Sequence, residues 1–181
     1  AIKHVFPCEH VEANSFPDKE EDNDLRIAFD FDGVLADDSS EKIYQSSGIG
    51  PFQLNEVAHA DQAIEKGPIY RFLKEISKIQ KEELKKKEMI EDYEPRVRIA
   101  VCTARNAPSH KRVENSLREW EIRVDEAFFL GGINKSKVLE VFKPHIFFDD
   151  QIGHIERVST HFSSVHIPYC VANSEQDSLK N

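Results

Sequence analysis

The sequence predicts an α/β protein built on a Rossmann-like, doubly wound parallel sheet. Continuous apolar runs recur along the chain, which is typical of strands that are buried on both faces of a sheet. Helical patterns separate these runs, and strands that alternate with helices favour a parallel sheet with right-handed crossovers. Polar clusters follow several of the runs directly, so the carboxyl ends of the strands are expected to carry the function.

Each expected strand is a short apolar run bounded by polar residues. The strongest runs are LRIAFDF and VRIAVCT, and HIFFDD is the clearest of the shorter ones. In chain order, the expected strands cover 25–31, 97–103, 127–130, 145–150 and 164–168.

Four helices with one apolar face are expected between the strands, at 69–90, 108–119, 135–142 and 152–162. The first of them carries apolar residues at a spacing close to 3.6 residues. Its run of lysine and glutamate side chains could suggest a contact with nucleic acid. We interpret it instead as a solvated face with pairs of opposite charge.

The segment 38–67 is too long for a simple strand-to-helix loop and contains several glycine and proline residues. An insertion after the first strand of such a sheet lies over the edge where ligands bind, so this segment is expected to form a small cap. The main domain is expected to cover 24–172, with a polar arm at 1–23 and a tail at 173–181. The arm is interpreted as flexible or as the remnant of a longer amino-terminal region.

The composition is that of a globular protein, with 39% hydrophobic and 31% charged residues among 181. No stretch approaches the ~20 apolar residues that span a membrane. A net charge of −9 argues against a nucleic-acid partner, but it allows a small anionic substrate because a bound metal ion can reverse the local charge.

Cys102 and Cys170 are interpreted as buried free thiols, and with Cys8 they lack the spacing of a zinc site. This cysteine usage fits a reducing cytoplasm.

Four polar clusters follow the first four expected strands. Asp30 and Asp32 come first and are expected on one face of an extended segment. Two carboxylates that close repel each other, so the pair favours a cation, and Mg²⁺ is the natural ion for oxygen ligands. The later clusters are Thr103 with Arg105, then Lys135 with Lys137 in reserve, then Asp149 with Asp150.

Each cluster alone has an ordinary structural explanation. An Asp-x-Asp after a strand can form a turn, and an aspartate pair can cap the next helix. A lone threonine is usually structural, and a lone lysine at a helix start is usually exposed. The complete set, in this order on successive strand ends, favours a catalytic site over these readings.

The ordered set resembles the four motifs of the haloacid dehalogenase superfamily. The blocks TARNAPSHKRV, LREWEIRVDEAFFLGG and FFDDQ are more specific, and they resemble the cytosolic type I 5'-nucleotidases and their bacterial relatives. The similarity runs from about Asp24 to Ala172. The resemblance implies a haloacid dehalogenase-like fold and a Mg²⁺-dependent phosphohydrolase.

The residue chemistry suggests a role for each cluster. Asp30 is the expected nucleophile, which forms an aspartyl-phosphate, and Asp32 is the expected general acid and base. Thr103 and Lys135 would hold the phosphoryl oxygens. The expected metal ligands are Asp30, Asp149 and, as the resemblance implies, the main-chain carbonyl of Asp32.

Other residues are expected to support the site or to contact the substrate. Arg105 could reach the phosphate or Asp150, or form a purely structural salt bridge. In the cap, Phe52 could contact the base or serve only in packing. The supporting set is Asp150 and Arg105, and the substrate-contact set is Phe52, Asn55, His59 and Ala104. The histidines His145, His154, His161 and His166 are interpreted as surface or core residues, not metal ligands.

The expected function is hydrolysis of nucleoside 5'-monophosphates to nucleoside and phosphate, in the cytoplasm. Two alternatives stay open: a phosphatase of the same superfamily for another small phosphometabolite, and a nucleotide-binding module without catalysis. Neither nucleic acid nor a membrane is an expected partner, and homo-oligomerisation is left open.

Overall fold

The computed structural model describes residues 21–169 of the chain. The interpretations made for Cys8, for Cys170, for the tail 173–181 and for nearly all of the arm 1–23 therefore fall outside the described residues. Within them, Cys102 is a buried free thiol, as expected.

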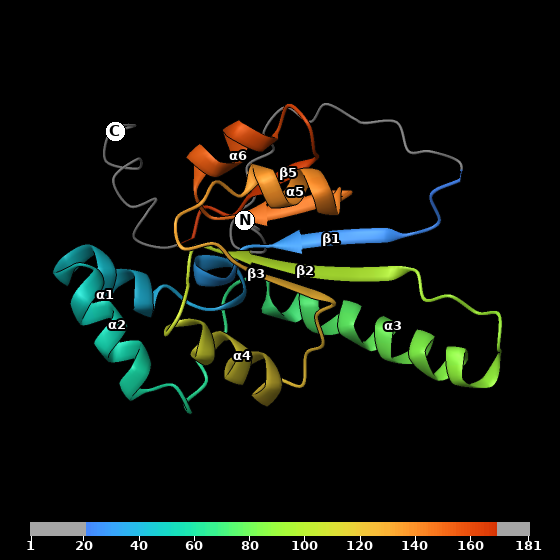
Figure 1. Ribbon diagram of the computed structural model, residues 1–181, viewed down its shortest axis with the longest axis horizontal. Helices are drawn as coiled ribbons and strands as arrows, with labels where there is room; N and C mark the ends of the chain where they lie inside the picture. Colours follow the sequence, from blue (N-terminus) through green and yellow to red (C-terminus); the bar gives the residue numbers. More distant parts are fainter. Residues whose placement is uncertain (1–20, 170–181) are drawn as a thin grey trace, which may run out of the picture.

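The described residues form one sheet in which all pairs of neighbouring strands are parallel. Its five strands lie in the order β3-β2-β1-β4-β5, and Figure 1 shows the strands side by side. This confirms the α/β, doubly wound fold class. The strand bounds are Leu25–Phe29 for β1, Val97–Thr103 for β2, Glu126–Phe129 for β3, Ile146–Asp149 for β4 and Ser164–His166 for β5.

Helices cover both faces of the sheet, which explains why the strands are continuously apolar. Helices α3 and α4 lie on one side of the sheet, and α5 and α6 lie on the other (Figure 1). Side chains of β1 alternate between the two cores: Ile27 and Phe29 pack with residues of α3 and α4, and Ala28 packs with residues of α5 and α6. The helices are α3 Tyr70–Met89, α4 His110–Glu119, α5 Ser136–Phe142 and α6 Ile152–Val158.

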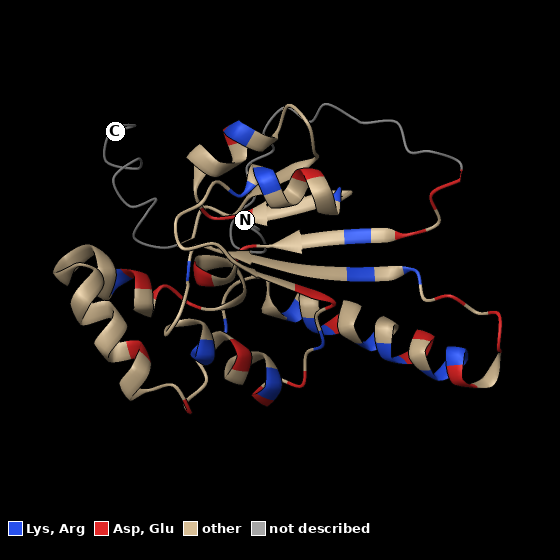
Figure 2. Cartoon of the chain, in the orientation of Figure 1, with Lys and Arg blue, Asp and Glu red and all other residues tan. Residues whose placement is uncertain are grey.

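The surface of α3 carries charges of both signs, intermingled along its length (Figure 2). Two lysine–glutamate pairs spaced three residues apart join neighbouring turns, between Glu75 and Lys78 and between Glu82 and Lys85. This arrangement agrees with a solvated helix face. None of the helices in residues 21–169 has the length and apolarity that crossing a membrane requires.

The expected cap segment folds into two helices, α1 Ser39–Ser47 and α2 Ile49–Ala58, which lie together at one end of the molecule (Figure 1). Its two ends meet in an isolated antiparallel bridge between Ala36 and Lys66. The amide of Gly67 donates to the carbonyl of Leu35 at 2.8 Å. Both ends of the segment that contains the two helices are therefore attached next to the turn that follows β1.

Candidate active site

The chain makes a tight turn over Phe31–Leu35, where β1 reaches the carboxyl edge of the sheet. The amide of Ala36 closes the turn by donating to the carbonyl of Phe31 at 2.9 Å. Gly33 has a φ of 72°, and a Cβ at this position would lie 2.7 Å from a carboxylate oxygen of Asp150. Glycine is therefore favoured at this position, and the turn packs directly against Asp150 at the end of β4.

Lys135 joins the carboxylates of Asp30 and Asp149 at the centre of this edge. Its Nζ lies 2.8 Å from Oδ2 of Asp30 and 2.7 Å from Oδ2 of Asp149. All three side chains are buried. Lys135 is the residue just before α5, whereas Lys137, two residues further along the chain, is exposed. Of the two candidate lysines, the structure brings Lys135 to the carboxylates.

The buried charges shift one another's protonation. Burial raises the pKa of Asp30 above its ordinary value, with a further upward contribution from Asp149, although Lys135 acts in the opposite direction. Burial disfavours the charged form of Asp149 as well, but Lys135 and then His154 outweigh it, so the pKa of Asp149 falls. For Lys135, burial disfavours the charged form, and Asp149 and Asp30 together raise its pKa.

Asp30, Asp149 and Asp150 form a group that could hold a metal ion. One carboxylate oxygen of each lies within 4.8 Å of the others, and all three residues are buried. Three buried carboxylates beside one lysine leave an excess of negative charge, and hard oxygen donors suit Mg²⁺. The donor set therefore fits a magnesium ion. The side chain of Asp32 lies outside this group. The ligand that the family resemblance implies for Asp32 is its main-chain carbonyl, not its side chain.

The orientation of Asp149 is fixed by neighbours from α6. The amide of Gln151 donates to Oδ1 of Asp149 at 2.8 Å, and Nδ1 of His154 lies 3.1 Å from Oδ2. Sequence reasoning gave His154 no role at the site, because one histidine on a short helix carries no distinguishing pattern. Its place one turn after the Asp149-Asp150 pair is the signal that could have identified it.

Arg105 connects the edge of the sheet with the cap. Its Nε and Nη2 donate to the two carboxylate oxygens of Asp32, each at 2.7 Å, and its Nη1 donates to Glu56 of α2. Of the possibilities left open for Arg105, these contacts favour an ion pair with groups other than Asp150. Thr103 is buried at the end of β2, and its Oγ1 accepts from the amide of Arg105 at 3.2 Å.

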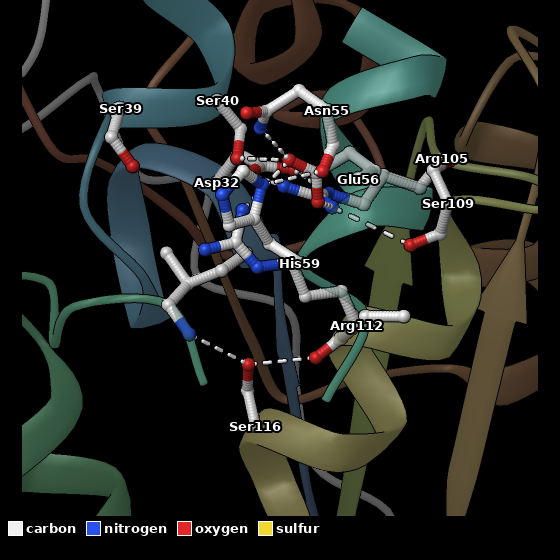
Figure 3. Close-up of polar contacts among 12 residues, drawn as sticks. Asp32, Ser39, Ser40, Asn55, Glu56, His59, Arg105, Ser109, Arg112 and Ser116 are labelled. Atoms are coloured by element: carbon white, nitrogen blue, oxygen red, sulfur yellow. Dashed lines mark hydrogen bonds and ion pairs between the residues drawn. The ribbon is translucent and has the colours of Figure 1, made fainter. Parts of the chain in front are cut away.

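Glu56 is a second residue that sequence reasoning missed. It is 1% exposed and accepts from Arg105, from Nη1 of Arg112 at 2.9 Å and from Oγ of Ser40 at 2.9 Å (Figure 3). Burial opposes its charge, but Arg105 and Arg112 more than compensate and lower its pKa. Nothing in the sequence IGPFQLNEVA of this short helix, in which apolar residues predominate, distinguishes a buried glutamate from an exposed one.

The expected substrate-contact residues lie around this cluster. Phe52 is buried, with its ring centroid 5.3 Å from the guanidinium carbon of Arg105. Asn55 donates to Glu56 at 3.1 Å, and Nδ1 of His59 lies 2.8 Å from the backbone carbonyl of Asn55. Ala104 is exposed beside Thr103. The structure thus brings Phe52 and Asn55 to Arg105 and Glu56, while His59 contacts the backbone of its own helix.

Two sequence comparisons relate the chain to known proteins. A family model described as 5'-nucleotidase matches residues 1–174. The human protein cytosolic 5'-nucleotidase 1B is 39% identical over 136 residues, which make up 75% of this chain and 22% of the human protein. The chain therefore spans about a fifth of the length of this curated relative.

A solved structure, that of a Pnkp1/Rnl/Hen1 complex, shares the fold. It aligns with a TM-score of 0.50 and covers 88% of this chain and 50% of the matched chain. Because only 13% of the aligned residues are identical, this likeness concerns the fold alone.

Proposed function

The chain belongs to the 5'-nucleotidase family, and on that premise we propose that it hydrolyses nucleoside 5'-monophosphates through an aspartyl-phosphate on Asp30, with Mg²⁺ as cofactor. The observation that carries the proposal is the buried group at the carboxyl edge, in which Lys135 lies within 2.8 Å of Asp30 and of Asp149.

Asp30 is the proposed nucleophile. A carboxylate attacks an anionic phosphate poorly unless nearby positive charge offsets the repulsion. Lys135 supplies one such charge, and it already lies against the carboxylate that would attack. Attack on phosphorus forms the aspartyl-phosphate and releases the nucleoside oxygen, and water then releases phosphate from Asp30. The hydroxyl of Thr103, at the end of the neighbouring strand β2, would donate to a phosphoryl oxygen.

The metal would be held by carboxylates of the same edge. Asp30 and Asp149 are the proposed ligands, with Asp150 beside them and the main-chain carbonyl of Asp32 completing the protein's share. When bound, Mg²⁺ supplies positive charge that neutralises the transferred phosphoryl group. His154 and the amide of Gln151 keep Asp149 turned toward this position.

Asp32 is the proposed general acid and base. It follows Asp30 by two residues in the turn, and its carboxylate is 19% exposed, so it can reach solvent and a leaving group. It would protonate the departing nucleoside oxygen and later take a proton from the attacking water. Phe52, Asn55, His59 and Ala104 are the proposed contacts for the nucleoside.

The proposal is tested by measuring phosphate release from a panel of nucleoside monophosphates, sugar phosphates and other phosphoesters, with Mg²⁺ and with a chelator. We expect Mg²⁺-dependent release that is highest for nucleoside monophosphates and is lost in Asp30→Asn. A preference for another phosphoester would indicate a different small-molecule phosphatase. Nucleotide binding without any phosphate release would contradict the catalytic proposal.

A further inference from the structure

We propose that Glu56 in the cap is a positioning residue for Asp32, acting through Arg105. This inference rests on the proposed function, because it concerns the residue that would protonate the leaving group. It adds a role for the cap beyond contact with the substrate: the cap would complete the support of the general acid. Figure 3 shows the contacts that link the three side chains.

The guanidinium of Arg105 donates hydrogen bonds to two carboxylates, Asp32 on one side and Glu56 on the other. Its Nε and Nη2 form a paired contact with both oxygens of Asp32, which fixes the direction of that carboxylate. Its remaining nitrogen, Nη1, faces away from Asp32 and donates to Glu56. A planar guanidinium held at both ends has little freedom to rotate, so Glu56 determines where Arg105 presents its paired donors.

The environment restricts Arg105 further. Its guanidinium carbon lies 5.6 Å from the ring centroid of Phe31 in the turn and 5.3 Å from that of Phe52 in α2. Arg105 is 4% exposed and Glu56 is 1% exposed. Water can therefore replace little of the Arg105–Glu56 contact, and without Glu56 the Nη1 group would be left in a buried position with only a 3.5 Å contact to the carbonyl of Ser109.

A purely structural role for Glu56 predicts something different. Glu56 also accepts from Arg112 of α4 and from Ser40 of α1, and these contacts fasten the cap to the core and its two helices to each other. Arg112 additionally donates from Nε to the carbonyl of Gln62 at 3.0 Å. Arg112 thus shares the fastening role but has no contact with Asp32, which makes it a matched control.

The discriminating measurement uses the leaving group. An alkoxide such as the 5'-oxygen of a nucleoside needs a proton as it departs, whereas p-nitrophenolate is stable as an anion and needs little help. The value of kcat/KM reports the steps up to departure of the leaving group. The ratio of kcat/KM for a nucleoside monophosphate to that for p-nitrophenyl phosphate therefore measures how much Asp32 contributes by protonating the leaving group. A loss of folded enzyme cancels in this ratio.

We expect Glu56→Gln to lower the ratio about 10–100-fold, the range typical of residues that orient a functional side chain. Glu56→Asp, which keeps the charge, should recover part of the loss. Arg112→Met should leave the ratio within about twofold of the wild-type ratio, whatever it does to the thermal midpoint. This pattern would support the assignment.

Two results would overturn it. An unchanged ratio in Glu56→Gln, or an equal fall in Arg112→Met, would mean that Glu56 only fastens the cap. If Glu56→Gln instead raised KM for both substrates at unchanged kcat, the function of Arg105 would be to bind the phosphate of the substrate, and not to orient Asp32. Failure of the proposed function itself is a separate result, because the wild-type enzyme would then release no phosphate from nucleotides.

Discussion

At the scale of single residues, the site depends on one lysine that is shared by two buried carboxylates. Two lysines follow the expected third strand closely, and the sequence alone does not distinguish them. The structure does: Lys135 contacts Asp30 and Asp149, whereas Lys137 is exposed two residues later. The difference follows from helix geometry, because residues two apart point to different sides of a helix.

This difference predicts unequal effects of the same substitution. Lys135→Met should lower kcat/KM for a nucleoside monophosphate about 10²–10³-fold, because it removes a fixed positive charge from the reacting phosphate. Lys137→Met should change it by less than about twofold. Steady-state kinetics with saturating Mg²⁺ measures both, with circular dichroism to check that each variant is folded. Equal losses in the two variants would contradict the assignment of Lys135.

Some residues of the site could be predicted from the sequence, and others could not. Asp30, Thr103 and Asp149 could be proposed because each stands at the end of an expected strand, and Lys135 because it follows another strand closely. Parallel strands bring those ends to one edge. Glu56 could not, because its burial depends on contacts with Arg105 and Arg112, about 50 residues away in the chain. Pairing of distant side chains leaves no periodic pattern to read.

At the scale of elements, the expected strands and helices agree with the structure in kind and order, and they differ at their ends. The first strand stops at Phe29, not at residue 31, because Asp30 and Phe31 enter the turn. Helix α6 stops at Val158, not at residue 162. Apolar runs predict where an element is buried, but hydrogen bonding decides where it ends.

The attachment of the cap to the rest of the domain depends on Gly67, where the cap segment ends. A Cβ on this residue would lie 2.3 Å from the carbonyl oxygen of Ala36 and 2.6 Å from that of Val34. Gly67→Ala should therefore push the two ends of the cap apart and lower the free energy of unfolding by about 1–3 kcal/mol. Urea unfolding followed by circular dichroism measures the change.

Gly50 offers a control within the cap. It lies in α2 with nothing within 4 Å of the position of a Cβ, so Gly50→Ala should leave stability unchanged or slightly higher. If both variants unfolded at the same urea concentration, close packing at Gly67 would not be what holds the two ends of the cap segment together.

At the scale of the whole molecule, the fold concentrates negative charge at one edge of its sheet. Asp30 and Asp149 come from the ends of the adjacent strands β1 and β4, and Asp150 follows directly. Folding buries these three carboxylates around the single ammonium of Lys135. The negative charge in excess of that one cation opposes stability unless a further cation is bound. Metal binding and folding should therefore be coupled, because the unfolded chain has no such arrangement.

Mg²⁺ is accordingly expected to raise the thermal midpoint of the wild-type protein. An ion that binds only the folded state stabilises it by about 2.7 kcal/mol at 100 times its dissociation constant, which corresponds to about 5–10 °C for a domain of this size. Asp149→Asn should abolish most of this shift, whereas Asp61→Asn, at an exposed position of the cap, should retain it. Differential scanning calorimetry across a Mg²⁺ titration, without substrate, measures the shift independently of activity. A midpoint that ignores Mg²⁺ in the wild-type protein would contradict a metal site at this edge, and an undiminished shift in Asp149→Asn would place the ion on other ligands.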